Sequence, residues 1–356
     1  MTAMRKILLA IACALAMIAG CGQDFDPGSR VTALRVLAVS ADARWDGTSA
    51  ATAASGQAWA KPGETVQLQS LWYVPKDDTR GRTWVWARCV DPDSTTVIGC
   101  MASIALELKR IGGDQAAQEA AFKKGESPFL TLPPLDGVGG IDIPHVSVKV
   151  PEDTLTRLPK EARRNATVGV LVIVCPGKVF INLRELGLRN ALPLKCLEDG
   201  TGRDLPLEEW VIGIKRIFVR DVDRNGNPAI ARVTWDGKDW AEGDVKEVSP
   251  CQTDGNRFDR CTDQEHHDVA AVLTPESFET GVDSESGTPF TEQLIVQYYA
   301  TEGLFEHDVR IARNPETAWT ARSAARDLKD GLVTMWFVAR DNRGGVVWTQ
   351  RTVHVK

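Results

Sequence analysis

The sequence has few of the residues and patterns on which enzymes depend. It contains five histidines among 356 residues, and it lacks the Gly-x-Ser-x-Gly, His-Glu-x-x-His, Gly-x-x-x-x-Gly-Lys-Ser/Thr and Gly-x-Gly-x-x-Gly motifs. Little material is therefore present for histidine-based acid–base catalysis. We expect no cofactor and no catalytic residue, although the scattered Asp and Glu residues leave open a carboxylate pair that forms only in the fold.

The amino-terminal apolar run is too short to span a bilayer. Residues 7–20 form an apolar stretch of fourteen residues after the basic pair Arg5-Lys6, which is the pattern of a cleaved secretory signal. The run ends in IAGC at residues 18–21, which resembles the bacterial lipobox at every position. This resemblance implies that Cys21 takes a diacylglycerol thioether and becomes the acylated amino terminus. An ordinary signal with a chance cysteine, or an uncleaved anchor, is the alternative.

The lipobox places the expected protein in a bacterial cell envelope. In such lipoproteins an aspartate after the cysteine favours retention in the inner membrane, and Gly22 occupies that position here. We therefore expect a lipid anchor in the outer membrane, with the protein facing the periplasm or the cell surface. Acyl chains contribute about 0.8 kcal/mol per buried methylene, so several chains on Cys21 would anchor a soluble protein stably. Residues 1–20 would be the signal peptide and 21–30 the lipidated tether.

The charge balance disfavours a nucleic-acid partner. The whole chain has 42 basic and 48 acidic residues, a net charge of −6. Removal of residues 1–20 takes away two basic residues and no acidic one, which leaves −8. An acidic protein lacks the electrostatic attraction to phosphates on which nucleic-acid binding depends.

The cysteines that remain after the lipobox predict disulfides. Six are left in an oxidising compartment, and no C-x-x-C spacing among them indicates zinc or thioredoxin-like chemistry. Six cysteines allow 15 connectivities. Their clustering along the chain favours bridges between sequence neighbours, while an inter-sheet bond between Cys89 and Cys175 is the alternative. The favoured pairs are Cys89 with Cys100, Cys175 with Cys196, and Cys251 with Cys261.

Short strands separated by turns indicate a mostly β protein. Alternation places Val66, Leu68 and Trp72 on one face of a strand, and 167–175 (TVGVLVIVC) is a continuous apolar strand of the kind covered on both faces. Many such strands and few helices predict two antiparallel immunoglobulin-like sandwiches. We expect one domain at 31–222, with insertions at 101–144 and 177–206 and short helices, and a second at 223–356.

Several strand and turn segments carry a resemblance. The segments VTALRVLAVSA, KPGETVQLQSLW, EEWVIGIKRIFV, NPAIARVTWDG and ARDNRGGVVWTQRTVHV look like uncharacterised bacterial outer-membrane lipoproteins with tandem immunoglobulin-like domains. The resemblance spans most of the mature chain and implies fold and envelope location. Its motifs are structural, so it carries over no catalytic residue.

One loop has the opening pattern of a calcium site. Asp221, Asp223 and Asn225 stand at positions 1, 3 and 5 before Gly226, where carboxylate and amide oxygens can converge on one cation. Position 12 is Arg232, so the EF-hand pattern fails and any Ca²⁺ ligand there must come from elsewhere. A polar interdomain linker is the alternative interpretation.

Tryptophans supply the remaining candidates for ligand binding. Trp45, Trp59, Trp240 and Trp319 fall in predicted loops or element ends, where exposed rings can stack on sugars or partner proteins. The leading hypothesis is a non-enzymatic envelope lipoprotein that acts as a structural or recognition module for an envelope protein or a polysaccharide. The alternative is a glycan-active envelope enzyme, or its accessory subunit, that uses these aromatics and nearby carboxylates.

Overall fold

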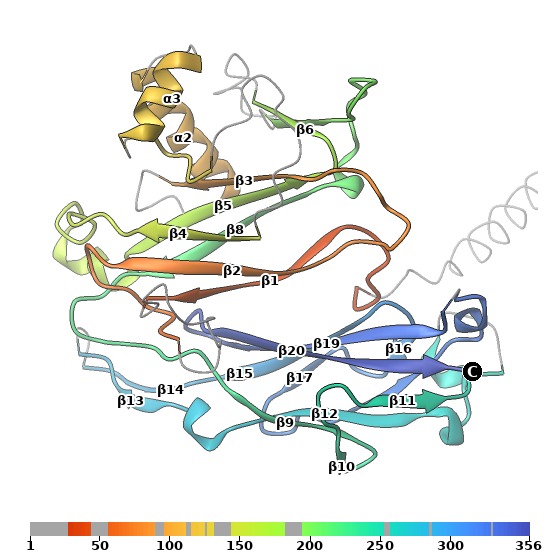
Figure 1. Cartoon of the computed structure of the whole chain (residues 1–356). Coiled ribbons are helices and arrows are strands. Elements are labelled where there is room, and N and C mark those ends of the chain that lie inside the picture. The colour runs from red at the N-terminus through yellow and green to blue at the C-terminus, as the bar shows by residue number, and fades with distance from the viewer. Residues whose placement is uncertain are drawn as a thin grey trace, which may run out of the picture.

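The computed structural model describes residues 28–43, 56–89, 96–111, 115–124, 127–131, 144–181, 194–252, 257–284, 287–328 and 330–356. The signal peptide, Cys21 and Trp45 lie outside these residues. The described chain is mostly β, and every strand ladder except β11–β20 is antiparallel (Figure 1). This confirms the predicted fold class. No helix among the described residues is long and apolar enough to cross a membrane.

The first sandwich consists of two three-stranded sheets. One sheet has the order β1 (Arg35–Asp42), β2 (Thr65–Tyr73), β4 (His145–Lys149), and the other β3 (Thr83–Arg88), β5 (Thr167–Cys175), β8 (Val211–Phe218). The alternating side chains of β2 and β3 fill the space between the sheets, because Val66, Leu68, Trp84 and Trp86 all belong to one buried cluster.

The second sandwich consists of two five-stranded sheets. One sheet has the order β10 (Lys238–Asp239), β9 (Ile230–Trp235), β12 (His267–Leu273), β18 (Thr317–Thr320), β16 (Leu304–Phe305). The other has the order β11 (Val245–Val248), β20 (Val346–Val355), β19 (Leu332–Asp341), β15 (Leu294–Ala300), β17 (Val309–Ile311). Large aromatics such as Tyr298, Trp319 and Phe337 fill the core between them.

Both sandwiches have the strand order of an immunoglobulin domain, in which strands A, B, E and D form one sheet and C, F and G the other. In the second sandwich, β9-β12-β18-β16 corresponds to A-B-E-D and β15-β19-β20 to C-F-G. In the first, β1-β2-β4 corresponds to A-B-E and β3-β5-β8 to C-F-G. The expected boundary at 222/223 falls in the segment that joins β8 to β9.

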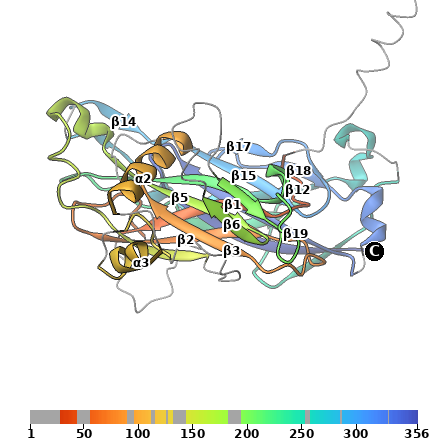
Figure 2. The same ribbon diagram turned by 90° about the horizontal axis from the view of Figure 1, so that it is seen from above.

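Insertions account for the larger size of the first sandwich. The segment between β3 and β4 carries α2 (Val97–Ile111) and α3 (Gln115–Lys123), and the segment between β5 and β8 carries the β6 (Lys178–Ile181) and β7 (Leu194–Leu197) hairpin. Figure 2 shows the helices over the β3-β5-β8 sheet. The second sandwich has a smaller insertion between β12 and β15, the hairpin of β13 (Thr280–Val282) and β14 (Pro289–Thr291).

All three disulfides join the predicted neighbours. Cys89–Cys100 ties the end of β3 to α2, and Cys175–Cys196 ties the end of β5 to β7. Cys251–Cys261 closes a loop between β11 and β12. The first two belong to a buried cluster that also contains Ile104 of α2, so the β3-β5-β8 sheet is covered on its outer face as well. This double cover explains why every residue of β5 is buried.

The two sandwiches are stacked on each other, which gives four sheet layers in succession (Figure 1). The outer face of β1 and β2 packs on the outer face of β19 and β20 through a hydrophobic cluster of its own. Leu71 and Trp336 are two of its buried members. A backbone irregularity at Leu37 in β1 presents a carbonyl that accepts a hydrogen bond from Arg340 Nη2 at 2.6 Å. The contact therefore combines an apolar cluster with a hydrogen bond between the sandwiches.

The chain enters the fold between the two sandwiches. Val31 N donates to Ala300 O at 2.8 Å, and Ala300 N donates to Ser29 O at 2.9 Å, at the end of β15. Ser29 and Val31 are buried. The residues that follow the predicted tether are thus fixed to both sandwiches.

Candidate functional site

The β3-β5-β8 sheet and its loops create a groove at one end of the first sandwich. It consists of two adjoining cavities of about 480 and 460 Å³ that share residues 32–34 and Glu208. We call it the end groove. The first cavity is also lined by 75, 77–80 and 209, and the second by 30–31, 35, 207 and 210–212. Each volume lies in the range of small-molecule and peptide pockets.

The position of the end groove follows from the immunoglobulin strand order. Its walls are the B–C loop between β2 and β3, the end of the F–G segment before β8, and the entry segment before β1. The F–G wall is a 3-10 turn at Leu207–Glu209 that starts after Pro206. In immunoglobulin variable domains the B–C and F–G loops of this end form the binding surface.

An ion-pair network holds the two loops together. Arg80 of the B–C loop donates from Nε to Asp78 Oδ1 at 2.9 Å and from Nη1 to Glu209 Oε2 at 2.7 Å. The hydrogen bonds that Arg80 donates to Asp78 and Glu209 raise the pKa of Arg80 above its ordinary value. The hydrogen bond from Arg80 lowers the pKa of the Asp78 carboxyl. Arg82 adds a hydrogen bond from Nη2 to Asp78 O at 2.7 Å, so the B–C loop is preorganised.

Two carboxylates at the groove have no basic side chain as a partner among the described residues. Asp77 and Glu208 are exposed, and neither makes an ion pair or side-chain hydrogen bond with another residue in the described part of the chain. They stand on opposite walls, one on the B–C loop and the other on the turn before β8. The groove therefore presents negative charge that its own arginines do not neutralise.

The floor of the second cavity is apolar. Leu34 and Trp210 are buried there, and Leu207 is 58% exposed beside them. Val211 and Ile212 also line this cavity, at the start of β8. Because β8 is the last strand of its sheet and β5 is its ladder partner, its other backbone edge faces away from the sheet.

The corresponding end of the second sandwich is closed by contacts with the first. Its F–G turn, 341–345, lies against residues 56–64 and the segment that joins the sandwiches. Trp59 Nε1 donates to Arg343 O at 2.6 Å, and Lys215 Nζ donates to Gly344 O at 2.9 Å. The Arg343 guanidinium lies 4.3 Å from the Trp59 ring centre and 4.1 Å from that of Phe290. These contacts cover the F–G turn of the second sandwich.

Buried charges surround this closed end. Arg343 Nη1 lies 3.1 Å from Glu292 Oε1, and the Glu292 side chain is 2% exposed. Burial, followed by the neighbouring Asp341 and Glu279 carboxylates, raises the pKa of Glu292 to about 7. Burial also lowers the pKa of Lys215 to about 8. We therefore expect the contact between the sandwiches to respond to pH.

The predicted ligand-binding tryptophans are buried, and this prediction is wrong for the three that the structure describes. Trp59 is 5% exposed because Arg343 and Arg220 stack on its ring at 4.3 and 4.9 Å. Trp240 is 1% exposed and belongs to the core of the second sandwich. Trp319 is fully buried in β18. The fourth, at position 45, lies outside the described residues.

Trp319 shows why a turn residue can determine the position of a core ring. Gly303 has a φ of +97°, and a Cβ at this position would lie 2.3 Å from Trp319 Nε1. The ring therefore packs directly on the glycine backbone, which only glycine permits. No ring edge is left for a sugar or a partner.

The predicted calcium residues have separate partners. Asp221 is exposed, whereas the Asp223 carboxylate accepts from Ser284 Oγ at 2.7 Å and from Ser284 N at 3.2 Å. Asn225 is fully buried, and its Nδ2 donates to Asp341 Oδ2 at 3.0 Å. The structure thus does not gather the three side chains around one point, and the calcium hypothesis rests on the sequence pattern alone.

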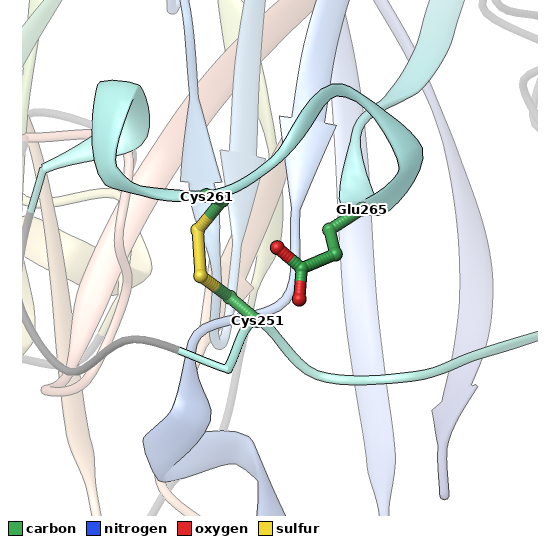
Figure 3. Close-up of side chains that lie close together, drawn as sticks. All are labelled: Cys251, Cys261 and Glu265. Carbon is green, nitrogen blue, oxygen red and sulfur yellow. A yellow bond between two sulfur atoms is a disulfide. The ribbon is translucent and has the colours of Figure 1, made fainter.

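One group of possible metal ligands is found in the described residues, and its members instead close a loop. Figure 3 shows Glu265 beside Cys251 and Cys261, with ligand atoms within 4.8 Å of one another. The two sulfurs are bonded to each other, so they do not offer thiolates. Glu265 accepts from Thr262 N at 2.7 Å and from Gln252 N at 2.9 Å. The Thr262 amide lowers the pKa of this carboxyl, which stabilises the loop.

Sequence reasoning did not find the end groove. Its walls come from segments near 33, 78 and 209, which are far apart in the chain. The available signals were the charged turns KDDTRGR at 76–82 and LEEW at 207–210, each directly before a predicted strand. Strands C and G lie on either side of strand F and run in the same direction, so the loops that precede them lie at the same end of the sheet. This rule links the two charged turns.

Comparisons with known proteins give weak structural likenesses. No family model matches the chain, and no curated protein matches it. The fibronectin(III)-like modules of Clostridium thermocellum CbhA align with a TM-score of 0.20 at 8% identity, over 90% of this chain and 94% of that one. A tandem of titin Ig domains aligns with a TM-score of 0.17 at 8% identity, over 83% and 90%. Dimeric latent PorU from Porphyromonas gingivalis aligns with a TM-score of 0.19 at 10% identity, over 91% and 24%. These scores are too low to support an inference about function.

Proposed function

We propose that this protein is a lipid-anchored recognition module of the bacterial outer membrane, without catalytic activity, that binds its partner in the end groove. The observation that carries this proposal is the contrast between the two sandwiches. The B–C and F–G end of the first is open and lined by unpaired carboxylates, whereas the F–G turn of the second is covered by contacts with the first. Antibody variable domains use this end for binding.

The lipobox supports the location. Cys21 lies seven residues before Gly28, where the described chain begins, and seven extended residues span at most about 25 Å. Because the entry segment also forms a wall of the end groove, a lipid on Cys21 would keep the groove near the membrane surface. The partner would therefore be an envelope component.

The burial of the tryptophans weakens the glycan-active alternative. Sugar-binding sites rely on exposed aromatic faces, and Trp59, Trp240 and Trp319 have none to offer. A protein partner fits the preorganised and charged end groove better than a polysaccharide does.

In-cell photo-crosslinking tests the proposal. A photoreactive residue would replace Thr79, which is exposed and lines the end groove, in the full-length lipoprotein. The matched control would replace Lys238, which is exposed on β10 of the second sandwich. We expect a discrete adduct from position 79 and none from position 238. Equal adducts at both positions, or none at either, would refute recognition at the groove.

A further inference from the structure

We propose that the end groove binds an extended peptide with a basic side chain, and that the peptide backbone pairs with the free edge of β8 at Val211 and Ile212. This inference deepens the proposed function and depends on it. Three independent features of the groove lead to it: its charge, its backbone edge and its apolar floor.

The charge of the groove selects a cation. Asp78 and Glu209 are already paired with Arg80, so they are not available to a ligand. Asp77 and Glu208 have no partner among the described residues, and they flank the first cavity from its two walls. A lysine or arginine side chain placed between them would form charge-assisted hydrogen bonds to either carboxylate.

The arginines of the second cavity indicate which of the two cavities receives the basic side chain. Arg30 and Arg35 line it, together with the apolar residues, and Arg35 Nη1 is directed to Gly28 O at 2.6 Å. A second basic side chain would meet like charge there. We therefore assign the basic side chain of the peptide to the first cavity and an apolar side chain to the second.

The free edge of β8 supplies the backbone contact. β8 follows β5 at the end of the sheet order, and the described residues give its other edge one isolated bridge, between Val219 and Ala60. That bridge lies beyond the last residue of β8, so Val211 and Ile212 at its first residues are not covered by it. An uncovered edge of this kind is a template for an added strand.

The apolar floor completes the site. In an extended peptide, successive side chains point to opposite faces, so alternate residues would meet the groove while the backbone meets β8. Leu34 and Trp210 form the floor, and the exposed Leu207 lies at the rim. An extended peptide with a basic and an apolar residue two positions apart, so that both side chains lie on the face toward the groove, is the ligand that uses all three features.

Calorimetry with defined peptides tests this inference on the mature chain, made soluble by Cys21→Ser. The probe is a capped lysine–valine octapeptide, two repeats of Lys-Ser-Val-Ser, which places lysine and valine on one face of an extended strand. We expect binding that becomes about threefold to thirtyfold weaker in the double variant Asp77→Asn, Glu208→Gln, because two exposed ion pairs are removed. The matched control variant is Glu276→Gln, Glu306→Gln on the second sandwich, which has the same change of charge and should bind within twofold of the parent.

Two further peptides separate charge from strand pairing. The same octapeptide with glutamate in place of each lysine should not bind. A lysine–valine octapeptide with alternate backbone N-methyl groups keeps its charge but cannot pair along one edge, so it should bind at least tenfold more weakly. Equal affinity for the N-methylated peptide would refute the pairing with β8. Equal affinity in the Asp77→Asn, Glu208→Gln variant would refute the charge assignment.

The outcomes also distinguish this inference from the proposed function. If crosslinking at position 79 persists in cells while the lysine–valine peptide fails to bind, the ligand class is wrong and the recognition function stands. If both fail, the groove is not a recognition site.

Discussion

Asn227 connects the two sandwiches and offers a sharp test of how they are joined. It lies in the segment between β8 and β9 and is 9% exposed. Its Nδ2 donates to Ala41 O of the first sandwich at 2.7 Å, and its Oδ1 accepts from Val346 N of the second at 2.9 Å. One side chain therefore satisfies a backbone group in each sandwich.

The cost of Asn227→Ala follows from these two bonds. Removing the amide leaves the Ala41 carbonyl and the Val346 amide buried without a partner, and each orphaned group costs about 1–3 kcal/mol. We expect the free energy of unfolding to fall by about 2–4 kcal/mol. Asn314→Ala, at an exposed turn whose side chain makes no recorded bond within the described residues, should change it by less than about 0.5 kcal/mol.

Urea unfolding of the mature Cys21→Ser chain measures both effects. The midpoint of the Asn227→Ala variant should fall, with tryptophan fluorescence and far-ultraviolet circular dichroism reporting whether the sandwiches unfold together. An unfolding free energy within 0.5 kcal/mol of the parent would contradict the reasoning, because it would mean that the segment 221–228 is a loose linker.

Three further predictions concern the anchor, the charges and the cation. Cys21→Ser should move the protein from the membrane fraction to the soluble fraction, and retention of the variant would refute lipidation. The folded protein holds the Glu292 proton more tightly than the unfolded chain, in which the carboxyl has its ordinary pKa of 4.5, so stability should fall as pH rises from 4.5 towards 7. Glu292→Gln should flatten this decline, and an unchanged pH profile would show that another group causes it. If Ca²⁺ binds the sequence motif, millimolar Ca²⁺ should raise the melting temperature of the parent but not of Asp221→Ala, Asp223→Ala; equal shifts would end that hypothesis.

The strands of each sandwich were predictable because their patterns are local. The alternation in β2 and the continuous apolar run of β5 depend on contacts within one sandwich, and the structure confirms them. The disulfides followed from sequence proximity in the same way.

The contact between the sandwiches was not predictable from these local patterns. Leu71 and Trp59 belong to a strand and a loop of the first sandwich, yet both are buried by residues of the second, from Trp336 to Arg343. The alanine-rich context of Trp319 favours a helix locally, but cross-strand pairing with His267 and Phe305 places it in a sheet. Tertiary packing outweighed local propensity at each of these positions.

The central claim is that the end groove is the binding surface of this protein, and filling the groove tests it most directly. Ala33 is exposed and lines both cavities, so Ala33→Trp would occupy the groove without altering the core. Ala324→Trp, at an exposed position of the second sandwich, is the matched control. Each substitution would be combined with the photoreactive residue at position 79, and adduct yield would be measured in cells. The account predicts that Ala33→Trp abolishes the adduct while Ala324→Trp preserves it; an undiminished adduct in the Ala33→Trp protein would contradict the claim.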